Sequence, residues 1–358
     1  MSKTKALDSF VIRHFHHTGI DTLYNYYRRR WRKARGYVHD FLGEEVPEKV
    51  IRWHLRRMRQ AYICNGWGFD EYFMYNYNHL SRAGRKEFAT ELQKDYFCDT
   101  IYPKRMEDFF TDKWDAYKCF AAYYKREACL LQSWERDHEE AERFIEKHNT
   151  IIIKPKDGSL GYGIHIIHDV TKDYLKELLQ KYEMGFVMEE LIHQGTEMAV
   201  LHPQSVNTVR ITTLRVGDKT HIIHPFFKVG RGENIVDNAA QGGIFGVIDI
   251  DTGVVTAACD KHGNRYVKHP ETDVQLIGFV IPKWKEALAL SLELAQVVPE
   301  ARYTGWDLAY TEEGWVVVEG NSRGQFICYQ MAEQKGFRKE LESMLGCSLK
   351  QFSKGLGK

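Results

Sequence analysis

The chain of 358 residues lacks any long hydrophobic run, and no apolar stretch approaches the roughly 20 residues that a membrane-spanning helix needs. Its first residues, MSKTKALDSFVIRHFHH, also lack the apolar core of a signal peptide. The seven cysteines are scattered and form no CxxC pair, so neither a disulfide framework nor a zinc site is indicated. We therefore expect a globular protein of the cytoplasm.

The chain has almost no excess of charge of either sign, because its formal net charge is only +1. Residues 1–60, however, hold 14 Lys and Arg against 6 Asp and Glu, a balance of +8 that leaves −7 for the remainder. Part of this excess is a run of arginines interleaved with Tyr26, Tyr27 and Trp31. The pattern is typical of a helix in weak contact with an anionic membrane surface, and equally of a solvated helix face. No nucleic-acid partner is expected.

Residues 151–168, IIIKPKDGSLGYGIHIIH, have the pattern of two strands joined by a glycine-bearing loop. Gly158, Gly161 and Gly163 lack Cβ atoms, so the backbone can approach a polyphosphate and direct N–H groups at its oxygens. Lys154 adds a positive charge from the first strand. The hairpin is either a nucleotide clamp or an ordinary turn. It is not a P-loop, because no Gly-Lys-Ser/Thr ends the loop.

Helices are expected over much of the first 65 residues, with Pro47 at a helix start, and in several later segments. One of them, FFTDKWDAYKCFAAYYK, offers Thr111 as the N-cap and carries Lys113 in its first turn. A cation is unfavourable at the positive end of the helix dipole unless an anion lies nearby. Lys113 therefore either faces a phosphate or points to water. Further helices are expected at TKDYLKELLQKY, capped by Thr171, and after Pro282.

The density of aromatic residues between positions 67 and 77 predicts a hydrophobic core rather than a ligand site. FVMEELI, residues 186–192, predicts a strand whose end can offer backbone groups and a glutamate to an adenine edge, although alone it is merely a strand end. From residue 205 onward, apolar and polar residues alternate between glycine and aspartate turns. This pattern predicts a mostly antiparallel sheet.

Oxygen-bearing side chains gather on the last predicted hairpin, YTGWDLAYTEEGWVVVEGN. Asp307 lies inside its first strand, and Glu319 and Asn321, two residues apart, face the same side of its second strand. Carboxylate and amide oxygens are ligands that Mg²⁺ prefers. A buried glutamate after an apolar strand needs a partner, which is either a metal or an ion pair with Arg210 or Arg323.

Six motifs in a fixed order resemble those of the ATP-grasp superfamily over about residues 110–330. They are DK, KPxxGSxGxG, an ExxI hinge, NTxR, an aspartate and ExN. Within that superfamily, HPQSVNTVRITTL, KHPETDVQLIGFVIP and GWDLAYTEEGWVVVEGN resemble the sugar-transfer-associated branch, which is found with cell-surface polysaccharide genes. The stretch VDNAAQGG is similar to a loop of the ribosomal-protein glutamate ligases.

The resemblance implies an α+β protein with the ATP-grasp fold, in which two α+β subdomains clamp ATP behind a mostly helical N-terminal region. The expected regions are 1–105, helical and basic; 106–195, the first subdomain with the glycine-rich lid; 196–330, the second subdomain with the metal site; and 331–358, a helical tail.

The resemblance also assigns the site residues. Those implied to bind the nucleotide are Lys113, Lys154, Lys156, Gly158, Ser159, Gly161, Gly163, Glu189, Glu190, Ile192 and Glu197. Asp307, Glu319 and Asn321 fall on the positions that hold magnesium, with two ions expected. Arg210, Arg323 and Asn238 are implied to be catalytic, facing the transferred phosphoryl group and the substrate carboxylate.

The activity that the resemblance implies is an ATP-dependent carboxylate–amine ligase that works through an acyl phosphate, forms a C–N bond and releases ADP and phosphate. The expected partners are ATP and small-molecule or glycan acids and amines, with an amino acid attached to a cell-surface polysaccharide sugar or a related precursor. Two alternatives remain open: a kinase on the same fold that phosphorylates a small molecule or sugar, and a nucleotide-binding protein that is not an enzyme.

Overall fold

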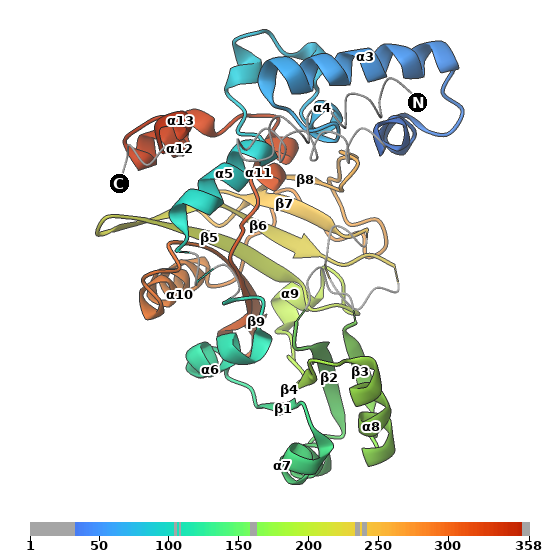
Figure 1. The fold of residues 1–358 in the computed structure, drawn as a ribbon, viewed down its shortest axis with the longest axis vertical. Helices are drawn as coiled ribbons and strands as arrows, with labels where there is room; N and C mark the ends of the chain where they lie inside the picture. Colours follow the sequence, from blue (N-terminus) through green and yellow to red (C-terminus); the bar gives the residue numbers. More distant parts are fainter. Residues whose placement is uncertain are drawn as a thin grey trace, which may run out of the picture. The chain divides into compact units, whose positions relative to one another are not determined.

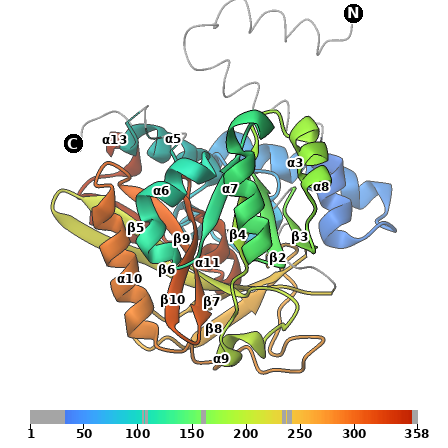
Figure 2. The same cartoon turned by 90° about the horizontal axis from the view of Figure 1, so that it is seen from below.

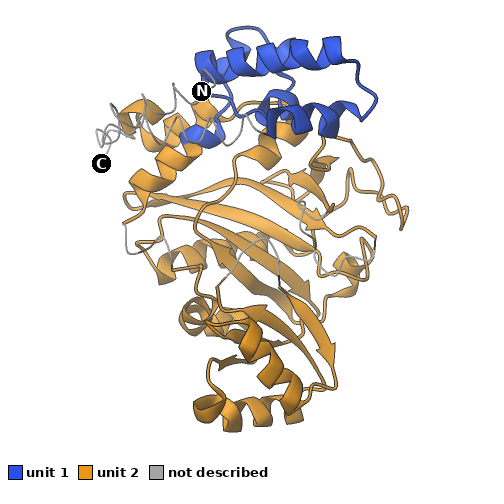
Figure 3. Ribbon diagram, turned by 45° about the vertical axis from the view of Figure 1, so that its right-hand side comes forward, with its two compact units in different colours: residues 1–93 blue, residues 94–358 orange. Residues whose placement is uncertain are grey.

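The computed structural model describes residues 33–103, 106, 109–157, 163–232, 237 and 242–352. The chain divides into two compact units, residues 1–93 and 94–358 (Figure 3). Some of the expected features lie outside the described residues. They are the arginine run at 28–32 and the site residues Gly158, Ser159, Gly161 and Asn238.

The first unit is helical and is built on an aromatic core. Its elements are a helical stretch over residues 33–42, α3 (Glu48–Asn65), α4 (Glu71–Met74) and two short 3₁₀ turns, η1 (Tyr77–His79) and η2 (Gly84–Lys86). Pro47 precedes α3 as expected, and Gly66 ends it with φ at 72°. Trp67, Phe69 and Tyr72 are buried together with Tyr75 and Tyr77, which confirms the predicted core. Helix α5 (Glu91–Ile101) begins in this unit and ends in the next.

The second unit contains two antiparallel sheets (Figure 1). The smaller has the strand order β1-β4-β2-β3, formed by β1 (Ala128–Leu131), β2 (Thr150–Pro155), β3 (His165–His168) and β4 (Phe186–Glu190). Strands β2 and β3 pair directly, with Ile152 opposite Ile166, so the predicted hairpin is confirmed. Helices α7 (Trp134–Lys147) and α8 (Lys172–Lys181) cover one face of this sheet.

Side-chain alternation divides β2 between the two faces of the small sheet. Ile151 and Ile153 lie in the core shared with Phe144 of α7 and Leu175 of α8. Because successive strand residues point to opposite faces, Lys154 is directed to the face that these helices leave uncovered. The packing of Ile151 and Ile153 against the helices thus fixes the direction of Lys154, which three consecutive isoleucines in the sequence do not reveal.

The larger sheet has the strand order β10-β9-β5-β6-β7-β8, and all its neighbouring strands are antiparallel, as predicted. Its strands are β5 (Thr208–Val216), β6 (Lys219–Val229), β7 (Ile244–Ile248), β8 (Val255–Cys259), β9 (Tyr303–Thr311) and β10 (Gly314–Asn321). Figure 2 shows α10 (Trp284–Val297) along this sheet, where it contacts β5 and β6. Helix α11 (Ile327–Glu333) packs on β7. The remaining helices of this unit are α6 (Lys113–Tyr124), α9 (Thr196–Ala199), α12 (Arg338–Leu345) and α13 (Leu349–Phe352).

Two expected helix starts are wrong. Helix α6 is capped by Asp112 rather than Thr111, because the Asp112 carboxylate accepts hydrogen bonds from the N–H groups of Trp114 at 3.0 Å and Asp115 at 3.1 Å. Helix α10 begins at Trp284 rather than at Pro282. Thr171 caps α8 as predicted. No helix in the described part of the chain combines the length and apolar character needed to cross a membrane.

Candidate functional site

A buried cluster of three charges lies on the uncovered face of the small sheet. The Lys154 Nζ donates to Glu189 Oε2 at 2.8 Å, and Arg126 donates to the same oxygen from Nε at 2.9 Å and from Nη2 at 2.6 Å. Burial alone would raise the pKa of Glu189, but Arg126 and Lys154 hold it at about 2. The carboxylate is therefore ionised and fixed by two cations.

Arg126 also joins the small sheet to the large one. Its Nη1 donates to the carbonyl oxygen of Val317 at 2.6 Å, and its Nη2 donates to that of Val318 at 3.3 Å. Strand β10 bulges between Val317 and Glu319, so the guanidinium group holds the backbone at the irregularity that sets the direction of Glu319. One side chain thus links both sheets of the site.

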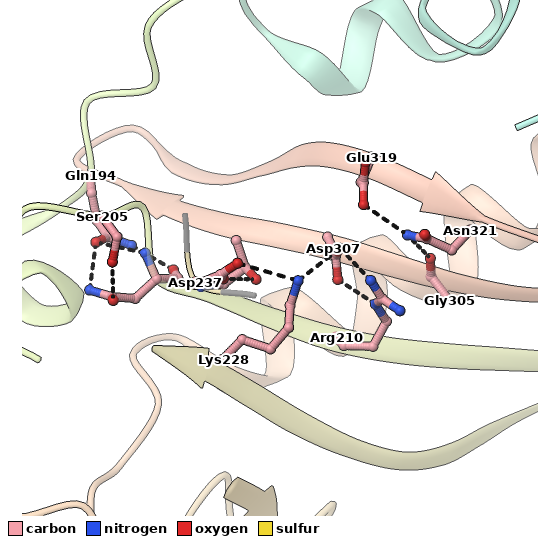
Figure 4. A network of polar contacts seen from close by, with 11 residues as sticks. Gln194, Ser205, Arg210, Lys228, Asp237, Gly305, Asp307, Glu319 and Asn321 are labelled. Carbon is pink, nitrogen blue, oxygen red and sulfur yellow. Dashed lines mark hydrogen bonds and ion pairs between the residues drawn. The ribbon is translucent and has the colours of Figure 1, made fainter. Parts of the chain in front are cut away.

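A second buried network follows the large sheet (Figure 4). Both oxygens of Asp307 are occupied, because Arg210 donates to Oδ1 and to Oδ2, the latter at 2.5 Å, and Lys228 donates to Oδ2 at 3.0 Å. Lys228 also lies 3.5 Å from Asp237, whose carboxylate accepts the N–H of Thr208 at 2.9 Å. Burial would raise the pKa of Asp307, but Arg210 and Lys228 hold it well below its usual range.

Glu319 lies directly opposite Asp307 in the β9–β10 register, as the hairpin predicted. Its Oε1 accepts a hydrogen bond from Asn321 Nδ2 at 3.3 Å, and Asn321 also donates to the carbonyl oxygen of Gly305 at 3.4 Å (Figure 4). Burial and the charge of Asp307 raise the pKa of Glu319. These contacts place three oxygen-bearing side chains together.

The two arginines considered as ion-pair partners of Glu319 bond to other carboxylates. Arg210 bonds to Asp307, and Arg323 pairs with Asp99 and, at 3.5 Å, with Asp95 of α5. Within the described residues, neither arginine therefore forms an ion pair with Glu319. The described residues contain no group of three His, Cys, Asp or Glu side chains that could hold a metal. The Glu319 carboxylate and the Asn321 amide oxygen nevertheless fit the oxygen donors that Mg²⁺ takes, provided that substrate oxygens complete the shell. Asp307 would have to exchange a bond to Arg210 or Lys228 for the metal.

Lys113 lies half-buried at the N-terminus of α6. Its N–H donates to the carbonyl oxygen of Lys156 at 3.0 Å, and the Lys156 ammonium pairs with the N-cap Asp112 at 2.6 Å, so the end of β2 fixes this helix terminus. Burial lowers the pKa of Lys113; Glu319 raises it, and Lys154 lowers it again. Lys113, Lys154 and Glu319 are therefore close enough to act on one another electrostatically.

A cleft of about 250 Å³ adjoins this charged cluster. Its lining residues come from the segment before β1, the segment after β4 and the β9–β10 turn: Tyr124, Lys125, Arg126, Glu190, Leu191, Ile192, His193, Thr311, Glu312, Glu313 and Val316. Glu190 and Ile192, both predicted to contact adenine, are among them. Glu189 is instead directed to Lys154 and Arg126.

Two further predicted site residues, Gly163 and Glu197, lie in other parts of the second unit. Gly163 has φ at 74°, and a Cβ there would lie 2.7 Å from Pro155 Cγ, so this end of the hairpin loop requires glycine. Glu197 is exposed on α9.

Sequence reasoning missed Arg126, Lys228 and Asp237. A lone lysine in the apolar strand HPFFKVG was a usable signal for Lys228, because a buried ammonium group needs carboxylate partners. Asp237 lies in the stretch VDNAAQGG, directly before the predicted site residue Asn238. Arg126 follows a helix end in the segment KREAC and carries no such signal, since its partners are distant in sequence.

Comparison with known proteins gives one family match. The family model described as sugar-transfer associated ATP-grasp matches residues 93–345, which is more than half of the chain. A chain with two antiparallel sheets and this charged site is thus of the ATP-grasp class. It belongs to the sugar-transfer-associated ATP-grasp family.

Solved structures show more distant similarity. A D-Ala:D-Ser ligase, VanG, from Enterococcus faecalis is 15% identical, with a TM-score of 0.42 over 70% of this chain and 62% of its own. A D-alanyl-alanine synthetase A from Vibrio cholerae is 12% identical, with a TM-score of 0.41 over 69% of this chain and 65% of its own. The present chain spans less than two thirds of the length of either. No curated protein matches the chain.

Proposed function

We propose that this protein is an ATP-dependent carboxylate–amine ligase that activates its acid as an acyl phosphate. The observation that carries the proposal is the contact between Lys154 and Glu189, whose second partner Arg126 bonds to β10 just before Glu319, which lies opposite Asp307. Lys113 adds a second lysine at the N-terminus of α6, held to the end of β2 by its backbone N–H. Two lysines beside carboxylates at a strand end suit a magnesium-bound polyphosphate, in which cations neutralise the phosphate oxygens.

In this proposal, ATP lies between the two sheets. Glu190 and Ile192 contact adenine, whereas Glu189 stays bonded to Lys154 and Arg126, and Glu197 contacts the ribose hydroxyls. The phosphates lie against Lys113, Lys154 and Lys156 and the loop that contains Gly158, Ser159, Gly161 and Gly163. The cleft along residues 190–193 supports the adenine position, because Arg126, which bonds to Glu189, is also among its lining residues. Arg126 has no direct role toward the nucleotide and holds Glu189 in place.

Magnesium, with two ions proposed, would be held by Asp307, Glu319 and Asn321 and would neutralise charge on the phosphate oxygens. Lys228 and Arg210 bond to Asp307 and so fix its carboxylate. Arg210, with Arg323 and Asn238, orients the substrate carboxylate and the transferred phosphoryl group.

The proposed reaction has two steps. A carboxylate oxygen of the acid attacks the γ-phosphorus of ATP, the bond to the β–γ bridging oxygen breaks, and ADP leaves. The neutral amine then attacks the carbonyl carbon of the acyl phosphate, the bond from that carbon to the phosphate oxygen breaks, and the proton lost by the amine ends on the released phosphate. Residues that exclude water from the closed site protect the acyl phosphate from hydrolysis. The proposed product is an amino acid joined to a polysaccharide sugar or its precursor in the cytoplasm. The family description, sugar-transfer associated, supports only the sugar part of this proposal.

A substrate-panel assay tests the proposal. The full chain is incubated with ATP, Mg²⁺ and pairs of sugar acids or amino sugars with amino acids, and ADP release and product mass are measured. We expect one pair to give ADP, free phosphate and a product that is lighter than its two components by one water. Phosphate retained on the product would indicate a kinase, and intact ATP with every pair, despite tight binding, would indicate a binding protein.

A further inference from the structure

One side of helix α3 is both basic and apolar, and it faces solvent. We call it the α3 basic face, and its exposed residues are Lys49, Arg52, Trp53, Arg56, Arg59 and Ile63. They recur every three or four residues, so they form one continuous stripe. The opposite side holds Ile51, Met58 and Ala61, which are buried in the first unit. The stripe is therefore already formed, and binding a partner needs no folding of the helix.

Large apolar side chains interrupt the positive charges of this face. Trp53 is 49% exposed and Ile63 is 66% exposed. Trp53 is also held in place, because its ring makes an edge contact with His54 and lies 6.0 Å from the Arg57 guanidinium carbon. Arg57 is itself fixed by a hydrogen bond to Asn78 Oδ1 at 3.2 Å. A tryptophan fixed among arginines and open to solvent is typical of side chains that lie at a membrane–water interface.

The charges on this face are weakly compensated. Among the described residues, the acid paired with this face is Glu48 in the first turn, which is shared between Arg35 and, at 3.9 Å, Arg52. The excess of +8 in residues 1–60 stands against −7 in the rest of the chain, so an anionic surface would attract this end of the sequence and repel the remainder.

We propose that the α3 basic face binds the surface of membranes that contain anionic lipids, with the arginines at the phosphate groups and Trp53 and Ile63 inserted between the headgroups. Exposed tryptophan and isoleucine favour a lipid surface over nucleic acid, because phosphodiester contacts need only the basic side chains. This proposal is independent of the ligase activity.

The expected binding is weak and salt-dependent. Each basic residue close to an anionic leaflet increases the membrane partition coefficient about five-fold, and salt screens this attraction. Loss of two such residues should therefore reduce partitioning about 25-fold, whereas loss of Trp53 should reduce it at high salt as well, because its contribution is apolar.

The test is co-sedimentation of the full chain with phosphatidylcholine vesicles that contain or lack phosphatidylglycerol. We expect binding only to the anionic vesicles at low salt, a loss of at least ten-fold for the double variant R52Q/R56Q, and a smaller loss for W53A. R82Q/K86Q is the matched control, because Arg82 and Lys86 are exposed in the same unit but lie outside α3.

Three results would overturn the proposal: no binding to anionic vesicles at low salt, an equal loss in the R82Q/K86Q control, or tighter binding to a short DNA duplex than to the vesicles. Circular dichroism of each variant establishes that the helices are intact. Because the readout is vesicle binding, the result does not depend on whether the substrate panel gives ADP.

Discussion

Arg126 and Glu189 form a buried ion pair in which two nitrogens of one guanidinium group donate to a single carboxylate oxygen. The same guanidinium donates to the backbone carbonyl groups of Val317 and Val318 in β10, the two residues before Glu319. The pair therefore couples the lysine-bearing small sheet to the carboxylate-bearing large sheet. Side chains that could meet a nucleotide are positioned by a residue that need not contact it.

The variant R126M should weaken both fold and site. Removing one partner of a buried ion pair leaves an under-compensated charge, which costs about 3–5 kcal/mol of unfolding free energy. We expect reduced stability in urea and weaker ATP binding by calorimetry, with R126K intermediate because it keeps the charge but not the fork of donors. The control is R143M, since Arg143 is exposed on α7. Unchanged stability and ATP affinity in R126M would show that Arg126 does not support the site.

The variant E319Q should abolish turnover with little effect on folding. Glutamine keeps the shape of the side chain but removes the negative charge, and burial beside Asp307 already disfavours that charge in the protein alone. We expect ADP release to fall at least 100-fold at every Mg²⁺ concentration, while the urea midpoint is unchanged or rises slightly. E286Q, an exposed change on α10, is the control. Wild-type turnover in E319Q would refute the metal role.

The variant K228M removes the cation that Asp237 and Asp307 share. Two buried carboxylates then lose a partner, so we expect a loss of about 3–5 kcal/mol in unfolding free energy, together with loss of ADP release. The control is K219M, because Lys219 is exposed at the start of the same strand. If K228M unfolds at the same urea concentration as K219M, the shared ion pair does not stabilise the sheet.

Stability of the first unit should fall as pH rises through neutrality, because burial, with the nearby Asp70 and Glu91 carboxylates, raises the pKa of Glu71 to about 8. Glu71 is protonated in the fold below that pH but ionises above about 4.5 when unfolded, so its stabilisation is complete below pH 4.5 and is lost by pH 8. The slope is about 1.4 kcal/mol per pH unit between these limits. Urea midpoints followed by tyrosine and tryptophan circular dichroism measure it.

The variant E71Q should flatten this pH dependence, because glutamine does not titrate. Its absolute stability is expected to fall, since the Glu71 carboxyl accepts the N–H groups of Gly68 and Glu91 and an amide offers only one acceptor oxygen. The same slope in E71Q and wild type would assign the pH dependence to another group.

Much of the fold could be predicted because it is encoded locally. The β2–β3 hairpin follows from isoleucine runs around a glycine loop, and the β9–β10 hairpin brings Glu319 opposite Asp307 through a short turn. Helix boundaries were not encoded as clearly. Thr111 and Asp112 are both capping residue types, and the structure distinguishes them by the hydrogen bonds of Asp112 to Trp114 and Asp115 and by its ion pair with Lys156 after β2.

The residue types and strand pattern of the chain fix which side chains are available to the site, because alternation along a strand sets the face that each one occupies. They do not fix which charges pair. Arg210, for example, bonds to Asp307 and not to Glu319. Arg126 bonds to Glu189, a carboxylate 63 residues away in the sequence. Such partners are set by the pairing of strands that are distant in sequence: Arg210 lies opposite Asp307 in the β5–β9 register, and β1, which follows Arg126, pairs with β4, which carries Glu189. A buried charge is stable only beside an opposite charge, and the tertiary fold brings that charge to it.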